Sequence, residues 1–124
     1  MSAALEIGTQ LVKLCQEGNS DGALDQLYSD SIVSIEGQGS DEMPARMEGI
    51  AAIKGKSEWW FANHEVHSME AEGPYVGHRE DQFVVRFHID ITPKGGERTQ
   101  LTEVGIYTVA DGKVQQEEFL YLMA

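Results

Sequence analysis

The stretch QFVVRFHIDIT, residues 82–92, alternates apolar and polar side chains with the period of two that is typical of a β-strand. One face of this strand is wholly apolar and consists of Phe83, Val85, Phe87, Ile89 and Ile91. The opposite face is mostly polar and consists of Val84, Arg86, His88 and Asp90. An apolar face of this size has to be covered, either by helices of the same chain or by a partner. How the rest of the chain surrounds this strand therefore decides the fold.

The chain on both sides of this strand predicts an α+β fold. Further strand patterns cover residues 66–72, 98–109 and 113–123, and turn signals rich in Gly, Pro and Asp separate them. Helical patterns cover residues 3–17, a short segment after Asn19, and residues 49–63, with one early strand at 31–36. Helices first and a meander of strands afterwards indicate an antiparallel sheet in a single domain over residues 1–124.

Composition excludes several classes of function. The formal net charge is −12, and the few basic residues are scattered, so we expect neither nucleic-acid binding nor attachment to an anionic membrane. No apolar run reaches the roughly 18 residues of a membrane span, and the first residues lack the features of a signal peptide, which favours a cytoplasmic location. Cys15 is the only cysteine, and its helical position predicts a buried, inert thiol.

Three short strings, in this order and spacing, resemble the nuclear transport factor 2-like superfamily and, within it, the SnoaL-like polyketide-cyclase proteins. They are LYSDSIV at 27–33, GIAAI at 49–53 and VADGKV at 109–114, and the resemblance covers nearly the whole chain. It implies that three helices pack against a strongly curved antiparallel sheet, so that a cone encloses a central cavity open at one end. It implies no cofactor. Because this fold supports isomerases, cyclases, dehydratases, hydrolases and non-catalytic binders, the resemblance does not fix the activity.

The resemblance also suggests individual site residues. Glu36 matches the carboxylate base of the ketosteroid isomerases, but Leu11 and Gly105 stand where those enzymes carry their oxyanion-hole groups. The acidic triad of the limonene-epoxide-hydrolase-like members is likewise broken, with Phe119 in place of its last aspartate. The closest equivalents of the acid–base pair of the SnoaL-like cyclases are Glu117 and His88.

The register of two hairpins decides which side chains share a face. A three-residue turn at Ala110–Gly112 puts Glu117 on the face of Glu103, whereas a two-residue Asp-Gly turn puts Glu118 there. A four-residue turn at Pro93–Gly96 sets Arg86 opposite Glu103. The residues alone do not decide the register of either hairpin.

If the two turns have three and four residues respectively, Arg86, His88 and Asp90 share a sheet face with Glu103 and Glu117. We expect this polar face of strand 82–92 to line the cavity. Glu36, Glu117 and His88 are then the candidate catalytic groups, since carboxylates and imidazoles transfer protons near neutral pH. The candidate substrate-binding residues are Arg86, Asp90, Glu103, Tyr107, Trp60, Phe119 and Tyr121. In the opposite arrangement Arg86, His88 and Asp90 are solvated pairs on the outer face.

These patterns leave three hypotheses about function. The first is a cofactor-independent cyclase, isomerase, dehydratase or hydrolase that acts on a small, largely apolar organic molecule by carboxylate–histidine chemistry. The second is a ligand-binding module without chemistry, and the third is a domain that mainly dimerises. If Arg86 faces the cavity, the apolar face of strand 82–92 lies on the outside of the sheet. We therefore expect a homodimer through the outer sheet face. No pair of histidines has metal-ligand spacing beside a carboxylate, so we expect no metal site.

Overall fold

The computed structural model describes residues 2–41 and 43–122, which form three helices and six strands. Helices α1 (Ala3–Gln16) and α2 (Ser20–Leu27) come first, followed by β1 (Tyr28–Ile35) and a short β2 (Arg46–Glu48). After helix α3 (Ile50–Asn63) the chain is almost entirely strand. The remaining elements are β3 (His64–Tyr75), β4 (Gln82–Pro93), β5 (Thr99–Ala110) and β6 (Lys113–Tyr121). The predicted α+β fold is confirmed.

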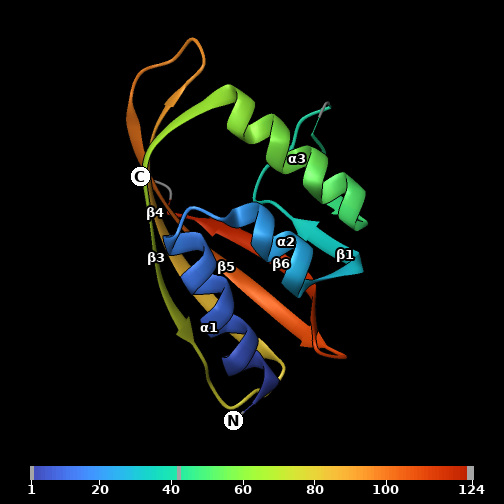
Figure 1. Cartoon of the computed structure of the whole chain (residues 1–124). Coiled ribbons are helices and arrows are strands. Elements are labelled where there is room, and N and C mark those ends of the chain that lie inside the picture. The colour runs from blue at the N-terminus through green and yellow to red at the C-terminus, as the bar shows by residue number, and fades with distance from the viewer. Residues whose placement is uncertain (1, 42, 123–124) are drawn as a thin grey trace.

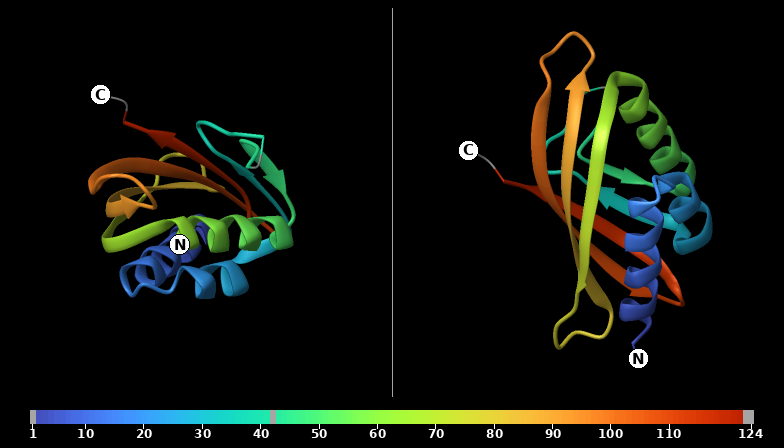
Figure 2. Two further views of the ribbon diagram at one scale, coloured as in Figure 1. Left: turned by 90° about the horizontal axis from the view of Figure 1, so that it is seen from above. Right: turned by 60° about the vertical axis from the view of Figure 1, so that its left-hand side comes forward.

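The six strands form one sheet in the order β2-β1-β6-β5-β4-β3. Neighbouring strands run antiparallel except for β1 and β6, which run parallel, so that the sheet is mixed. Figures 1 and 2 show that the sheet is curved and that all three helices lie on its inner side. Among the described residues, no helix has both the length and the apolarity to cross a lipid bilayer.

The core lies between helix α1 and the apolar face of β4. Phe83, Val85 and Ile91 are almost completely buried there. Gly8 allows α1 to approach closely, because a Cβ at this position would lie 2.7 Å from Pro74 and 2.9 Å from the ring of Phe83. Helix α1 therefore covers the apolar face of β4, which the sequence analysis expected to be covered either by helices of the same chain or by a partner.

This arrangement corrects the predicted facing of strand 82–92. The Pro93–Gly96 turn does form, with the Gly96 N–H donating to the Pro93 carbonyl at 2.9 Å. Pairing then begins with Ile91 opposite Thr99, one residue away from the predicted register. Arg86 consequently lies opposite Val104, and Phe87 lies opposite Glu103. Because side chains alternate along a strand, this single step moves every side chain of β4 to the other face.

The hairpin between β5 and β6 combines features of both predicted alternatives. Its turn has two residues, Asp111 and Gly112, with φ angles of 54° and 74° that suit a tight hairpin. A bulge between Thr108 and Val109 then adds one residue to the β6 strand. Tyr107 consequently lies opposite Glu117, and Glu117 faces inward as the three-residue turn predicted.

Candidate functional site

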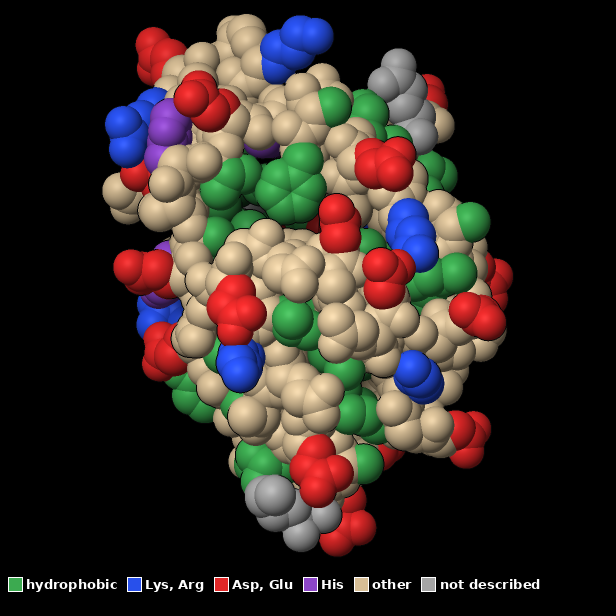
Figure 3. Space-filling model, in the orientation of Figure 1, with side chains coloured by type: hydrophobic (Ala, Val, Ile, Leu, Met, Phe, Trp, Pro, Cys, Tyr) green, Lys and Arg blue, Asp and Glu red, His purple; other side chains and the backbone are tan. Residues whose placement is uncertain are grey.

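A pocket of about 680 Å³ lies between the inner face of the sheet and the helices. This volume falls in the range of about 300–1,000 Å³ that small-molecule sites occupy. Its walls are rich in aromatic side chains, namely Tyr28, Trp59, Trp60, Phe61, Phe87, Tyr107, Phe119 and Tyr121. In the face shown in Figure 3, hydrophobic side chains gather in a hollow below helix α3, while acidic side chains are spread over the surface around it. The pocket therefore suits a largely apolar organic molecule.

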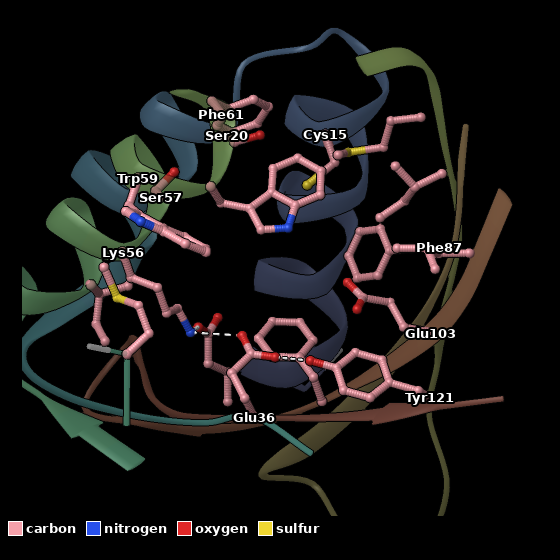
Figure 4. A pocket seen from close by; sticks show the side chains of 18 of the residues that line it. Cys15, Ser20, Glu36, Lys56, Ser57, Trp59, Phe61, Phe87, Glu103 and Tyr121 are labelled. Atoms are coloured by element: carbon pink, nitrogen blue, oxygen red, sulfur yellow. Dashed lines mark hydrogen bonds and ion pairs between the residues drawn. The ribbon is translucent and has the colours of Figure 1, made fainter. Parts of the chain in front are cut away.

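Four charged side chains line the pocket among the described residues: Glu36, Lys56, Glu103 and Glu117. They come from four different elements, since Glu36 follows β1, Lys56 lies on α3, and the other two lie on β5 and β6. Figure 4 shows Glu36, Lys56 and Glu103 pointing toward a common space. Their surroundings differ, and that difference determines what each can do.

Glu117 is the deepest of the four and is only 3 % exposed. The hydroxyl of Tyr28 donates to its Oε1 atom, and Ser34 Oγ donates to Oε2 at 2.6 Å. Burial raises the pKa of the Glu117 carboxyl, while the Lys56 ammonium and these two hydrogen bonds act in the opposite direction. Ser34 reaches it because the parallel pairing of β1 with β6 sets Ser34 beside Glu117.

Lys56 joins Glu117 to Glu36. Its Nζ atom donates to Glu36 Oε1 at 2.9 Å and to Ser34 Oγ at 2.6 Å, and lies 3.9 Å from Glu117 Oε2. The same ammonium lies 5.5 Å from the centre of the Phe119 ring, within the range of a cation–π interaction. On the other side, Tyr121 donates a hydrogen bond to Glu36 Oε2 (Figure 4). Both carboxylates are thus held by donors from this chain.

Glu103 differs from the other two glutamates, because its carboxyl has no hydrogen bond or ion pair among the described residues. It lies beside Phe87 of β4 and Tyr121 of β6 in the sheet, and Figure 4 shows it pointing into the pocket. Burial raises the pKa of Glu103 to about 7, and the negative charges of Glu36 and Glu117 act in the same direction. A carboxyl with this pKa exchanges a proton readily near neutral pH.

Tyr107 closes the floor of the pocket and is 2 % exposed. Its ring stacks on Phe83, with centroids 4.8 Å apart, and meets Phe119 edge-on at 6.2 Å. Burial, together with the charge of Glu117, raises the pKa of the Tyr107 hydroxyl well above its usual range, so the phenol stays protonated. Nearby Cys15 also lines the pocket, and burial raises the pKa of its thiol to about 11, in keeping with an inert side chain.

Comparison with known families and structures now gives the context of this pocket. The model of the SnoaL-like domain matches residues 2–121. The chain belongs to this family. No curated protein matches it significantly.

Among solved structures similar to this SnoaL-like domain, a SnoaL-like polyketide cyclase candidate from Mesorhizobium loti is 43% identical, with a TM-score of 0.86 over 94% of this chain and 97% of that one. An isomerase candidate from Bacillus subtilis is 17% identical, with a TM-score of 0.72 over 97% and 86%. A computationally designed 17-OHP binder is 18% identical, with a TM-score of 0.74 over 99% and 95%. The last two share the fold alone.

Seven of the ten predicted site residues line the pocket of the SnoaL-like domain. They are Glu36, Trp60, Glu103, Tyr107, Glu117, Phe119 and Tyr121. Trp60 is held in place by His64, whose ring stacks on the indole at 4.5 Å and whose Nδ1 atom contacts the Trp60 carbonyl oxygen. Their roles in binding or catalysis are taken up below.

The placement of Arg86, His88 and Asp90 in the pocket is wrong, since all three lie on the other face of β4. Arg86 lies 3.7 Å from the exposed Glu72, and Asp90 accepts hydrogen bonds from Arg98. His88 Nδ1 contacts the hydroxyl of Thr102 at 3.0 Å. All three side chains thus take part in polar contacts on the outer face, as in the alternative arrangement, and we assign them no role in the pocket.

Three side chains that contact the pocket carboxylates were not among the candidates from the sequence: Lys56, Tyr28 and Ser34. A signal for Lys56 existed, because it stands three residues after Ile53 and four before Trp60 and therefore shares their helical face. Ser34 is two residues before Glu36 on the same strand face. Tyr28 gave no comparable signal, because its contact with Glu117 depends on how β1 pairs with β6.

Proposed function

We propose that this protein binds a small, largely apolar carbonyl compound and catalyses proton transfer on it without a cofactor, as isomerases and aldol-type cyclases do. The observation that carries this proposal is Glu103, a carboxyl without a partner among the described residues in an aromatic pocket, with its pKa raised by burial to about 7. Such a group removes a proton from carbon in its ionised form and returns it in its protonated form.

Lys56 supplies the second requirement, which is stabilisation of the negative oxygen that forms when a carbon beside a carbonyl loses its proton. Its ammonium lines the same pocket and has three N–H groups, of which two donate to Glu36 and Ser34, so that one remains for such an oxygen. Donors fixed in a partly dry site stabilise such an oxyanion more strongly than water does. Glu36 and Glu117 then serve to hold Lys56 in position, while Glu103 acts as the base in place of the predicted carboxylate–histidine pair.

Hydrogen–deuterium exchange on 2-tetralone, a bicyclic ketone with acidic α-protons, tests this function. In D₂O near neutral pH, we expect the protein to accelerate exchange over buffer, as followed by proton NMR. Glu103→Gln should lose at least about tenfold of that acceleration, since positioned acid–base groups typically supply more than this. The matched control is Glu118→Gln, which makes the same change of charge on the neighbouring residue of Glu117, outside the pocket lining. No acceleration by the wild-type protein, or an unchanged rate in Glu103→Gln, would contradict the proposal.

A second candidate function is ligand binding without chemistry. It is supported by Glu36 and Glu117, the two predicted bases, each of which already accepts hydrogen bonds from side chains of this chain. Under this alternative, 2-tetralone or a related compound binds in the pocket while its exchange rate stays that of buffer.

Three further expectations remain proposals. One is a homodimer through the outer sheet face, where the apolar residues now include Val104 and Ile106 of β5 and exclude the apolar face of β4. The others are a cytoplasmic location, which cell fractionation tests, and a single domain over residues 1–124. One coincident unfolding transition by circular dichroism and tryptophan fluorescence would support the single domain.

A further inference from the structure

The charges around the pocket are unbalanced. Three carboxyl groups, of Glu36, Glu103 and Glu117, face a single ammonium group, that of Lys56, among the described lining residues. The ammonium is already engaged by Glu36 at 2.9 Å and approached by Glu117 at 3.9 Å. The described lining residues therefore offer no net positive charge to an acidic ligand, whereas the Glu103 carboxyl can pair with a basic one.

The walls of the pocket suit a cation as well. Aromatic side chains make up much of the lining, and the face of an aromatic ring attracts a cation, more strongly where water is excluded. The pocket already shows this interaction once, in the contact between the Lys56 ammonium and the Phe119 ring. The net charge of −12 over the whole chain additionally favours the approach of cations and disfavours that of anions.

We infer that the pocket selects an apolar ligand that carries a protonated amine, with the ammonium group next to Glu103 and the apolar body between the aromatic walls. This names a ligand class of the same pocket, and it shares Glu103 with the proposed function without depending on proton transfer. The two uses of Glu103 are distinct, because an ammonium group bound beside the carboxylate occupies it and lowers its pKa.

The inference predicts how binding depends on pH. With its pKa at about 7, Glu103 is mostly protonated at pH 6 and mostly ionised at pH 8. A ligand cation that binds the ionised form should therefore bind about tenfold more tightly at pH 8 than at pH 6. The groups that surround Glu103 are Glu36, Lys56 and Glu117, with Tyr107, Tyr121 and Cys15 as the remaining titratable residues of the lining. Burial raises the pKa of each of these last three well above 8, and no described histidine lines the pocket.

Three probes with one bicyclic skeleton separate charge from shape. They are 2-aminotetralin, which is a cation at pH 6–8, the neutral 2-tetralol, and the anionic tetralin-2-carboxylate. Isothermal titration calorimetry of the full chain should give the affinity order amine, then alcohol, then acid. The affinity of the amine should rise about tenfold from pH 6 to pH 8, while that of the alcohol stays within about twofold.

Glu103→Gln is the matching variant, and we expect it to weaken amine binding about tenfold and to remove the pH dependence. Binding of 2-tetralol should stay within about twofold, and Glu118→Gln should bind all three probes as the wild-type protein does. The inference is overturned if the alcohol or the acid binds as tightly as the amine, or if the amine does not bind at millimolar concentration. It is also overturned if wild-type binding of the amine is independent of pH, a result that needs no variant to fold. Exchange on the neutral 2-tetralone is measured separately. A failure of proton transfer can therefore be told apart from a failure of amine binding.

Discussion

Glu103 and Glu117 face the same pocket, but only Glu117 has donors of its own. Two hydroxyl groups and the nearby Lys56 ammonium compensate its burial, whereas Glu103 has Phe87 and Tyr121 as its neighbours in the sheet. Burying a charge without a partner is costly, and a carboxyl escapes this cost by keeping its proton. At the scale of single residues, we therefore propose different roles for the two glutamates: Glu117 holds the surrounding donors in place, and Glu103 exchanges a proton.

The raised pKa of Glu103 predicts how the stability of the protein depends on pH. Below the ordinary value of 4.5, Glu103 is protonated in both the folded and the unfolded chain. Between pH 4.5 and about 7 the unfolded chain loses this proton first, so Glu103 lowers the free energy of unfolding as pH rises, by at most about 3 kcal/mol. Glu103→Gln should therefore gain about 1–3 kcal/mol relative to wild type between pH 4.5 and pH 8, as measured by urea unfolding. Glu118→Gln is the control, and the same difference in stability at both pH values would refute the prediction.

Lys56 should be important for stability, because it lies among three carboxyl groups in the pocket. Lys56→Met keeps most of the side-chain volume but leaves Glu36 and Glu117 without their cation. We expect a loss of about 2–4 kcal/mol in the free energy of unfolding at pH 8, with a smaller loss at pH 5, where carboxyls more readily take up protons.

Lys54 provides a matched comparison on the same helix. Its ion pair with Asp25 at 2.7 Å is formed by side chains that are 47% and 61% exposed. Lys54→Met should therefore leave the free energy of unfolding nearly unchanged. Equal losses for the two variants would mean that the contacts of Lys56 are no stronger than those of a surface pair.

At the scale of elements, the sequence pattern was sufficient for the helices and the long strands, because their periods of 3.6 and two are long and regular. Only β2 was missed, since its three residues lie within a segment that reads as a loop. The facing of β4 could not be predicted in the same way. It depends on Glu97 and Arg98, which form no ladder pair and lie between the Pro93–Gly96 turn and Thr99. The chemistry of these two side chains does not indicate that they stay unpaired.

The bulge in β6 is a similar case. It compensates the two-residue turn, so that Glu117 faces the pocket although this turn alone was expected to place Glu118 there. The candidate residues of β5 and β6 therefore line the pocket, whereas those of β4 do not. Side chains whose contacts cross distant strands, such as Tyr28 with Glu117, depend on both registers at once and lie beyond what a local pattern can give.

Gly105 shows how a strand makes room for the pocket floor. A Cβ at this position would lie 2.7–3.0 Å from the ring and hydroxyl of Tyr107, which is itself fixed against Phe83. We expect Gly105→Ala to lower the free energy of unfolding by about 1–3 kcal/mol and to displace the Tyr107 ring. Chemical denaturation measures the first effect, and near-ultraviolet circular dichroism of the tyrosines reports the second.

The matched control is Gly55→Ala in the middle of helix α3, where an added Cβ would meet nothing within 4 Å. In a helix, Ala is preferred over Gly by about 0.5–1 kcal/mol, so this variant should be more stable than wild type. If both substitutions changed stability in the same direction, packing against Tyr107 would not explain the effect at Gly105.

At the scale of the whole molecule, the outer sheet face still carries an apolar patch, although not the one first considered. It consists of Val84, Val104, Ile106 and Leu120, which are neighbours through the pairing of β4, β5 and β6. Leu120 is 46% exposed. We propose that a second copy of the chain covers this patch.

Light scattering after size exclusion should give twice the mass of the chain at micromolar concentration. Leu120→Glu should give the mass of a single chain, because it places a charge in the patch. Val76→Glu changes a residue of similar exposure outside the strands, and should leave the mass of wild type. A single-chain mass for the wild-type protein would rule the dimer out.

The position of β6 has a consequence for how the molecule is made. It is the last of the described strands along the chain, yet it lies in the middle of the sheet and joins the β2-β1 pair to β5, β4 and β3. During synthesis, the β2-β1 pair and the β5-β4-β3 part of the sheet can therefore join only after β6 has been made. Pairings between such distant segments close large loops and form late. Since Glu117 lies on β6 and contacts Tyr28 and Ser34, the pocket should be among the last parts of the protein to form.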